Sequence, residues 1–287
     1  MKEINIFPFY NKAVKLPGIS ILDSKEISFE PMNGIDFTEI SALAYDEKKG
    51  FFALSDRGNL FTLSLKLEDK KIKELKLIQA RSLLSKKGKH FTRKKRDSEG
   101  MDLTEDGLVI SFELTPKVSL FDFDARKIRN YEIIESLKSA KNYRSKNKAL
   151  EAVLYHPELG VITAPEAPLK HLNEGTHTLY SLHKRWNFQA SGKITALELL
   201  EDKNILVLER EFSLLRGHHI VLKKVFIQGC GTQQCDTEIL ASLKSTQGWT
   251  LDNFEGLTHI KENIYLMVSD DNGNFFQKCL IVLFEVI

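Results

Sequence analysis

The sequence lacks any run of 18 or more apolar residues, and its most apolar segment, 279–287, is far shorter. A helix needs about 20 such residues to cross a bilayer, so no transmembrane helix is expected. An excess of charge of one sign is also missing, because 41 Lys and Arg oppose 39 Asp and Glu. This balance gives no general attraction to nucleic acid, and we expect no nucleic-acid partner. With 42% apolar residues, the chain is too hydrophobic to stay disordered.

Cysteine is scarce, with only three residues in 287. Cys230 and Cys235 flank a short glycine-containing loop that a disulfide could close, whereas Cys279 stands in an apolar segment and is expected to be buried. No apolar core follows the basic start at the N-terminus, so this chain shows no signal peptide. Two localisations therefore stay open. A disulfide would favour a periplasmic or secreted protein cloned in its mature form, and free thiols would favour a cytoplasmic one.

Helical periodicity is nearly absent and is confined to residues 131–140. Short apolar runs rich in Val, Ile, Leu and Phe recur instead between turn residues along the whole chain. This pattern predicts an all-β protein.

One unit repeats five times: a hairpin of two apolar strands with an acidic residue at most of its beginnings and ends. The five copies are 39–56, 99–113, 151–166, 195–209 and 255–270. Their starts are 60, 52, 44 and 60 residues apart, close to the length of a four-stranded propeller blade. We predict one β-propeller domain over residues 1–287, with five or six four-stranded blades. The segment at about 15–30 has no hairpin of its own and is predicted to complete the last blade.

The acidic residues of the repeat are predicted to form two rings at one mouth of the central channel, because a hairpin returns to the face where it begins. The first ring contains Glu39, Glu99, Glu151, Thr195 and Glu255, and the second contains Asp56, Glu113, Glu166, Glu209 and Asp270. An alternative is that acidic residues only mark solvated strand ends. That alternative does not explain why carboxylates directly adjoin apolar strands.

So many converging carboxylates repel one another unless positive charge neutralises them. Arg57, Arg210 and Lys148 are nearby in sequence but are too few. Only oxygen ligands occur in the repeat, which favours a hard cation, Ca²⁺ before Mg²⁺. The predicted ligands are Glu39, Asp56, Glu99, Glu151, Glu255 and Asp270. An outer shell of Glu113, Glu166, Glu209 and Arg210 is predicted to orient them.

Several motifs resemble the bacterial phytase-like family, also described by its esterase-like activity. They include Asp97-Ser-Glu-Gly-Met101, Ala53-Leu-Ser-Asp-Arg-Gly58, Leu208-Glu-Arg-Glu-Phe-Ser213, Asn253-Phe-Glu-Gly-Leu257 and Ser269-Asp-Asp-Asn272. The resemblance implies a propeller with an acidic, metal-binding centre, hydrolysis of a phosphoester or ester, and export from the cell. The third repeat departs from the pattern because Ala152 follows its Glu, and the fourth has no leading Glu.

Two function classes follow from these observations. In the first, the protein is a calcium-dependent hydrolase of a small anionic or ester substrate, with Glu99, Glu255, Asp270 and Arg57 as candidate catalytic residues. In the second, the ion is structural, and an exported, non-catalytic propeller binds a ligand or a protein partner. A monomer is expected in either case. The basic segment 86–96, with seven Lys or Arg, could attract an anionic substrate, lipid or polymer, or could simply be a solvated loop.

Overall fold

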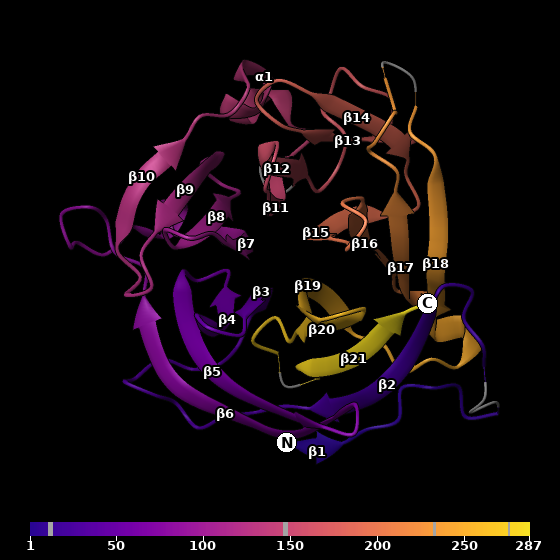
Figure 1. The fold of residues 1–287 in the computed structure, drawn as a ribbon. Coiled ribbons are helices and arrows are strands. Elements are labelled where there is room, and N and C mark those ends of the chain that lie inside the picture. Colours follow the sequence, from indigo (N-terminus) through magenta and orange to yellow (C-terminus); the bar gives the residue numbers. More distant parts are fainter. Residues whose placement is uncertain (11–13, 146–148, 232–233, 275) are drawn as a thin grey trace.

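The computed structural model describes residues 1–10, 14–145, 149–231, 234–274 and 276–287. In this part of the chain the strands form five antiparallel sheets arranged radially around a central axis (Figure 1). The prediction of an all-β propeller is confirmed, and the number of blades is five. Among the described residues, no helix is long and apolar enough to span a bilayer.

Four of the blades use strands that are consecutive in sequence. The first blade contains β3 (Ile40–Asp46), β4 (Gly50–Ser55), β5 (Asn59–Glu68) and β6 (Lys71–Ser82), and the second contains β7 (Ser98–Leu103), β8 (Leu108–Phe112), β9 (Lys117–Phe121) and β10 (Lys127–Tyr131). The third contains β11 (Leu150–His156), β12 (Gly160–Pro165), β13 (Thr176–Tyr180) and β14 (Arg185–Gln189). The fourth contains β15 (Lys193–Leu199), β16 (Ile205–Ser213), β17 (Gly217–Val225) and β18 (Thr237–Lys244). The first strand of each set lies at the channel, and the last lies at the rim (Figure 1).

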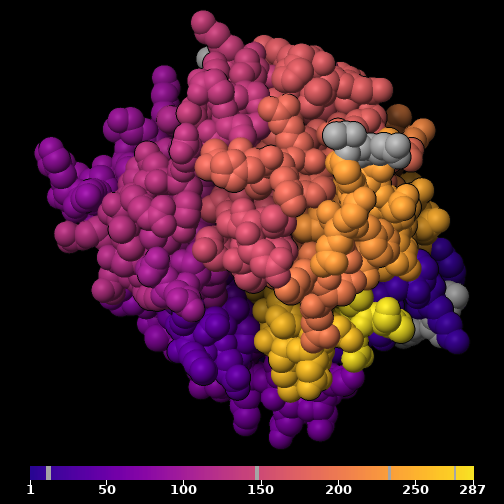
Figure 2. All heavy atoms as spheres, turned by 45° about the horizontal axis from the view of Figure 1, so that its top comes forward, coloured from indigo at the N-terminus to yellow at the C-terminus, as the bar shows by residue number. Residues whose placement is uncertain are grey.

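The fifth blade joins the two ends of the chain. Its strands, in sheet order, are β19 (Asn253–Lys261), β20 (Ile264–Asp270), β21 (Leu280–Val286), β2 (Ile19–Glu26) and β1 (Lys2–Glu3). β2 pairs antiparallel with β21 from Ile19 opposite Val286 to Glu26 opposite Leu280. Residues near the two ends of the chain are therefore neighbours on the surface, as indigo and yellow atoms show in Figure 2. This pairing closes the ring.

Over the described ranges, helical structure is limited to short segments. They are α1 (Glu135–Lys138), which falls inside the one region with helical periodicity, and the 3₁₀ turns η1 (Arg93–Lys95), η2 (Ala140–Asn142) and η3 (Ser245–Gln247).

The hydrophobic core is divided among the blade interfaces. Each of five clusters of buried side chains combines residues from two neighbouring blades. In the cluster between the second and third blades, for example, Val109 and Val118 pack with Leu150 and Val153. Strands in this arrangement are covered on both faces. This explains why the sequence shows continuous apolar runs rather than strict alternation.

The two ends of one loop are joined by a disulfide between Cys230 and Cys235, one of the two alternatives that the sequence left open. The backbone N–H of Cys235 donates to the carbonyl of Asn187 in β14, 2.6 Å away. This loop of the fourth blade is thus fastened to the third. Cys279 is a free thiol and is buried, as predicted.

Candidate metal centre

A β-bulge at the same position of all five innermost strands builds the centre of the propeller. At this point the pairing of the first with the second strand shifts, and one or two residues of the first strand are left without a direct partner. The residues in the bulges are Ser41, Glu99 with Gly100, Glu151, Thr195 and Glu255. Three of the five bulges therefore carry a glutamate.

This register corrects one ring assignment. Glu39 was predicted to share the ring of Glu99, but Ile40 pairs with Ser55 and Ala42 with Leu54, so Ser41 occupies the bulge. Glu39 lies two residues earlier, at the position of Asp97 in the second blade. The signal was present in the sequence, because the first repeat spans 17 residues between its acidic ends and the others span 14 or 15.

A similar correction applies to the fourth blade. Ile194 pairs with Glu209, and Lys193 pairs with Arg210. Arg210 therefore occupies the position that Asp56 holds in the first blade, and Glu209 lies one residue deeper. The acidic ring after the second strands is thus interrupted by an arginine.

The closest carboxylate cluster belongs to the second blade. Oxygen atoms of Asp97, Glu99 and Glu113 all lie within 4.8 Å of one another. The hairpin fixes this approach, because the backbone N–H of Glu113 donates to the carbonyl of Asp97 (3.1 Å). Backbone N–H groups also orient two of the side chains: Leu114 donates to Asp97 Oδ2 (3.2 Å), and Ala149 donates to Glu113 Oε1 (3.1 Å). Asp97 was quoted in a motif but not predicted as a ligand.

Glycine permits the close packing at this cluster. A Cβ atom on Gly100 would lie 2.7 Å from the carbonyl oxygen of Glu151 and 2.7 Å from Ser111 Oγ. Ser111 Oγ lies 3.0 Å from the same carbonyl oxygen and donates a hydrogen bond to it. The bulge of the second blade is therefore seated directly on the bulge of the third.

Electrostatic repulsion links the carboxylates across blades. Burial, followed by repulsion from Glu255, Glu113 and other carboxylates, raises the pKa of Glu99 well above its usual range. Burial and repulsion from Glu99 do the same to the pKa of Glu151. The pKa of Glu113 is raised to about 8, mainly by burial, although its hydrogen bond from Ala149 opposes the shift. The charges of these side chains therefore interact across the boundary between the second and third blades.

The first and fifth blades contribute further carboxylates to the centre. Burial raises the pKa of Asp56 to about 7 and that of Asp270 to about 8, with repulsion from Glu39 and Glu255 respectively as the next cause. Asn253 Nδ2 donates to Glu255 Oε1 (2.7 Å) and lies 3.4 Å from Asp270 Oδ2. The loop after β20 reaches the first blade, because the N–H of Glu39 donates to a side-chain oxygen of Asp271 (2.8 Å).

Four of the predicted site carboxylates already have a basic partner. The pairs are Glu39 with Arg57, Glu166 with Lys193 (2.8 Å), Glu209 with Lys223 (2.7 Å) and Glu255 with Arg210 (3.3 Å). The sequence suggested Arg57 and Arg210 but not Lys193 or Lys223. Lys148, the third suggested base, lies outside the described residues.

The other six carboxylates of the centre have no direct basic partner in the described ranges. No described residue forms an ion pair with Asp56, Asp97, Glu99, Glu113, Glu151 or Asp270. Asp56 Oδ1 is buried and has no hydrogen-bond partner within the described part of the chain. An all-oxygen set of this kind, with an orphaned buried oxygen, fits a hard divalent cation. Asp97, Glu99 and Glu113 are the nearest candidate ligands, with Glu151 beside them.

A cavity of about 320 Å³ adjoins this centre. It is lined by Glu39, Asp56, Arg57, Arg93, Arg96 and Asp97. Three arginines and three carboxylates therefore face one space. The guanidinium groups can bind an anion there, while the carboxylates border the candidate cation position.

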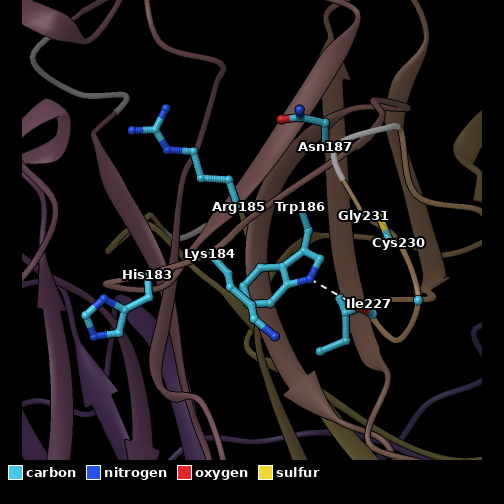
Figure 3. A pocket seen from close by; sticks show the side chains of 9 residues that line it. His183, Lys184, Arg185, Trp186, Asn187, Ile227, Cys230 and Gly231 are labelled. Atoms are coloured by element: carbon cyan, nitrogen blue, oxygen red, sulfur yellow. Dashed lines mark hydrogen bonds between the residues drawn. The ribbon is translucent and has the colours of Figure 1, made fainter.

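A larger cavity of about 650 Å³ lies elsewhere, between β14 and the disulfide loop (Figure 3). Trp186 lies on its wall and donates from Nε1 to the carbonyl of Ile227, 3.2 Å away, as the dashed line shows. His183, Lys184 and Arg185 lie along the same wall (Figure 3). None of its lining residues belongs to the predicted acidic rings, so volume alone does not identify the site.

A family profile described as "Phytase-like: Esterase-like activity of phytase" matches residues 35–273, which include all of these carboxylates. The chain belongs to the phytase-like family. No curated protein has a significantly similar sequence. This family membership agrees with the resemblance of the sequence motifs to the phytase-like family.

Solved structures with similar coordinates include a putative gluconolactonase (TM-score 0.48, 9% identity, 92% of this chain and 92% of that chain). A second is a PQQ-bound aldose sugar dehydrogenase from Streptomyces coelicolor (TM-score 0.48, 10% identity, 96% of this chain and 100% of that chain). A third is the Cps50 (Swd1) propeller domain from Myceliophteria thermophila (TM-score 0.44, 10% identity, 94% of this chain and 92% of that chain). Likenesses at these scores support no inference about the activity of this phytase-like chain.

Proposed function

We propose that the protein is a calcium-dependent hydrolase that acts on phosphoesters, with carboxyl esters as the second substrate class. The observation that carries the proposal is the carboxylate cluster of Asp97, Glu99 and Glu113 beside a cavity lined by three arginines. A cation and an anionic group can occupy adjacent positions there. Family membership supports a hydrolytic activity of this class.

Ca²⁺ is proposed rather than Mg²⁺ because it accepts six to eight oxygen ligands in flexible geometry. The first ligands would be Asp97, Glu99 and Glu113. The other predicted ligands, Glu39, Glu151, Glu255 and Asp270, lie on the first, third and fifth blades. When bound, the ion would supply Lewis acidity at a phosphoryl or carbonyl oxygen.

The chain's own residues would hold the substrate and move the proton. Arg57, Arg93 and Arg96 would bind the anionic oxygens in the cavity. Asp56 lines the same cavity, and its buried Oδ1 has no hydrogen-bond partner among the described residues, so this carboxylate would be the general base that accepts a proton from water. Glu255 and Asp270, predicted to be catalytic from the sequence, border the centre on the side of the fifth blade.

The proposal is tested by measuring calcium binding and hydrolysis together. Isothermal titration should detect Ca²⁺ binding, and Ca²⁺ should raise the melting temperature in a way that a chelator reverses. Glu99→Gln should reduce calcium affinity at least about tenfold, because it removes one charged ligand from the cluster. Glu105→Gln is the matched control, since Glu105 is exposed on the turn between β7 and β8 at the other end of the hairpin.

Hydrolysis is measured with p-nitrophenyl phosphate, bis(p-nitrophenyl) phosphate and p-nitrophenyl acetate. We expect calcium-dependent release of p-nitrophenol from a phosphate substrate, lost in Glu99→Gln and kept in Glu105→Gln. Calcium binding without hydrolysis of any of the three would instead favour the non-catalytic propeller with a structural ion. Absence of calcium binding would contradict both functions.

We also propose that the protein is exported, to the periplasm or the medium, and acts as a monomer. The Cys230–Cys235 disulfide supports export, because oxidising compartments preserve such bonds. Fractionation of the native host, with thiol counting by mass spectrometry, tests this. Recovery in the cytoplasm with three free thiols would contradict it.

A further inference from the structure

The paired ladder of β16 and β17 extends further at the acidic face than the corresponding ladder of β4 and β5 in the first blade. In the first blade the chain leaves β4 at Ser55 and re-enters β5 at Asn59. In the fourth blade the ladder continues for three pairs beyond Arg210, through Glu211 with His219 and Phe212 with His218 to Ser213 with Gly217. At about 3.3 Å per residue, this adds roughly 10 Å to the hairpin. The tip, residues 214–216, therefore projects beyond the ring of carboxylates.

The tip carries apolar side chains that contact little of the protein. Leu214 is 94% exposed, Leu215 is 96% exposed and Phe212 is 52% exposed. The base of the hairpin, in contrast, is held in place: Phe212 packs against the His218 ring (4.7 Å between centroids), and the N–H of His218 donates to Ser245 Oγ (3.2 Å). A fastened hairpin thus presents two leucines to its surroundings.

Basic side chains lie on the same face of the propeller as this apolar tip. Arg216 is part of the tip itself and is exposed. Across the channel, the segment Arg93–Arg96 places four consecutive basic residues at the surface. It is fastened to the turn between β8 and β9, because Thr115 Oγ1 donates to the carbonyl of Lys94 (2.9 Å) and Lys117 Nζ to that of Lys95 (3.2 Å). This turn follows Glu113 and so lies at the acidic mouth of the channel.

We infer that this face docks on an anionic lipid surface, with Leu214 and Leu215 inserted among the lipid chains and Arg216, Lys94 and Lys95 at the headgroups. Apolar side chains at a protruding tip, combined with Lys and Arg beside them, are what interfacial binding requires. Two leucines and part of a phenylalanine offer far less than the about 800 Å² per partner that a stable protein interface buries, which argues against a second copy of the chain. The inference is independent of the proposed hydrolysis.

The experiment is co-sedimentation of the purified full chain with vesicles of phosphatidylcholine alone and with vesicles that also contain phosphatidylglycerol. We expect binding to the anionic vesicles and little binding to the neutral ones. Leu214→Ser with Leu215→Ser should lower the partition coefficient at least about tenfold, because the apolar contribution is lost. Ile78→Ser is the matched control: Ile78 is 55% exposed on the outermost strand of the first blade, and its variant should bind like the wild type.

A second variant separates the electrostatic contribution. Lys94→Gln with Lys95→Gln should weaken binding to anionic vesicles several-fold and reduce its dependence on salt. Three results would overturn the inference: no binding of the wild type to anionic vesicles, equal binding of the leucine variant, or a dimer in sedimentation velocity that the leucine variant abolishes. Because the substituted positions are exposed, the variants should fold like the wild type, and equal melting temperatures check this.

Discussion

Glu209 and Lys223 form an ion pair that is almost completely removed from solvent. Their residues are 0% and 1% exposed, and Lys223 Nζ lies 2.7 Å from Glu209 Oε2 and 2.7 Å from the carbonyl oxygen of Gln189. Ser191 donates its N–H to Glu209 Oε1 (2.9 Å). These contacts satisfy Glu209 within the protein. We therefore assign it a structural role rather than a place in the proposed calcium site.

The pair predicts an asymmetric response to mutation. Lys223→Met leaves Glu209 buried without a counter-charge and should lower the free energy of unfolding by about 3–5 kcal/mol. Lys223→Met combined with Glu209→Gln removes both charges and should recover at least half of that loss. Urea denaturation of the two variants measures the difference. A double variant as unstable as the single one would contradict this account.

The β-bulges of the innermost strands place glutamates at the centre of the propeller. A bulge recurs in all five inner strands, yet only the bulges with Glu99, Glu151 and Glu255 contribute carboxylates. Thr195 instead ties neighbouring blades, since its Oγ1 lies 3.1 Å from the carbonyl of Phe254 and donates to it. The same β-bulge therefore positions residues of the candidate site and residues that hold neighbouring blades together.

Gly100 tests the importance of this element. Gly100→Ala would place a methyl group 2.7 Å from the carbonyl oxygen of Glu151, and the required shift should cost about 1–3 kcal/mol of stability. Calcium affinity should fall as well, because Glu99 moves with the bulge. Gly175→Ala is the control, since its nearest neighbour would be 3.5 Å away. Thermal denaturation and calorimetry distinguish the two variants, and equal stabilities would contradict the expected clash.

At the scale of the whole molecule, two half-buried carboxylates connect neighbouring blades. Asp102 accepts from the N–H of Tyr155 (2.6 Å), linking the second blade to the third. Glu198 accepts from the N–H of His259 (2.8 Å), linking the fourth to the fifth. Burial raises the pKa of Asp102 to about 6 and that of Glu198 to about 8, with repulsion from Asp102 adding to the latter.

These shifts predict how stability depends on pH. The folded protein keeps protons that the unfolded chain releases near pH 4, so these two groups make stability fall as pH rises from about 4 to about 8. Glu198→Gln mimics the protonated side chain. Relative to the wild type, the variant should gain roughly 1–3 kcal/mol between pH 5 and pH 8.5. Urea denaturation at both pH values measures this, and identical pH dependence in both proteins would contradict it.

The sequence by itself determined the fold class and the repeat. Each hairpin brings together residues only 14 to 17 positions apart, so strand-forming residues and turns encode it locally. The same pattern placed most of the acidic residues at one face. It also indicated that glycine follows Glu99 and Glu255 where chains approach closely, as a Cβ on Gly256 would lie 2.6 Å from Val268 Cγ1.

Only the tertiary structure decided which carboxylates are neutralised and which are not. Lys193 reaches Glu166 from the next blade, and Lys223 reaches Glu209 from the neighbouring strand. The bulge register moved Glu39 out of its expected ring, and pairing of β7 with β8 brought Glu113 beside Asp97 and Glu99. Charge interactions depend on the distances between side chains, and here these side chains come from different strands. The order of residues along the chain does not specify those distances.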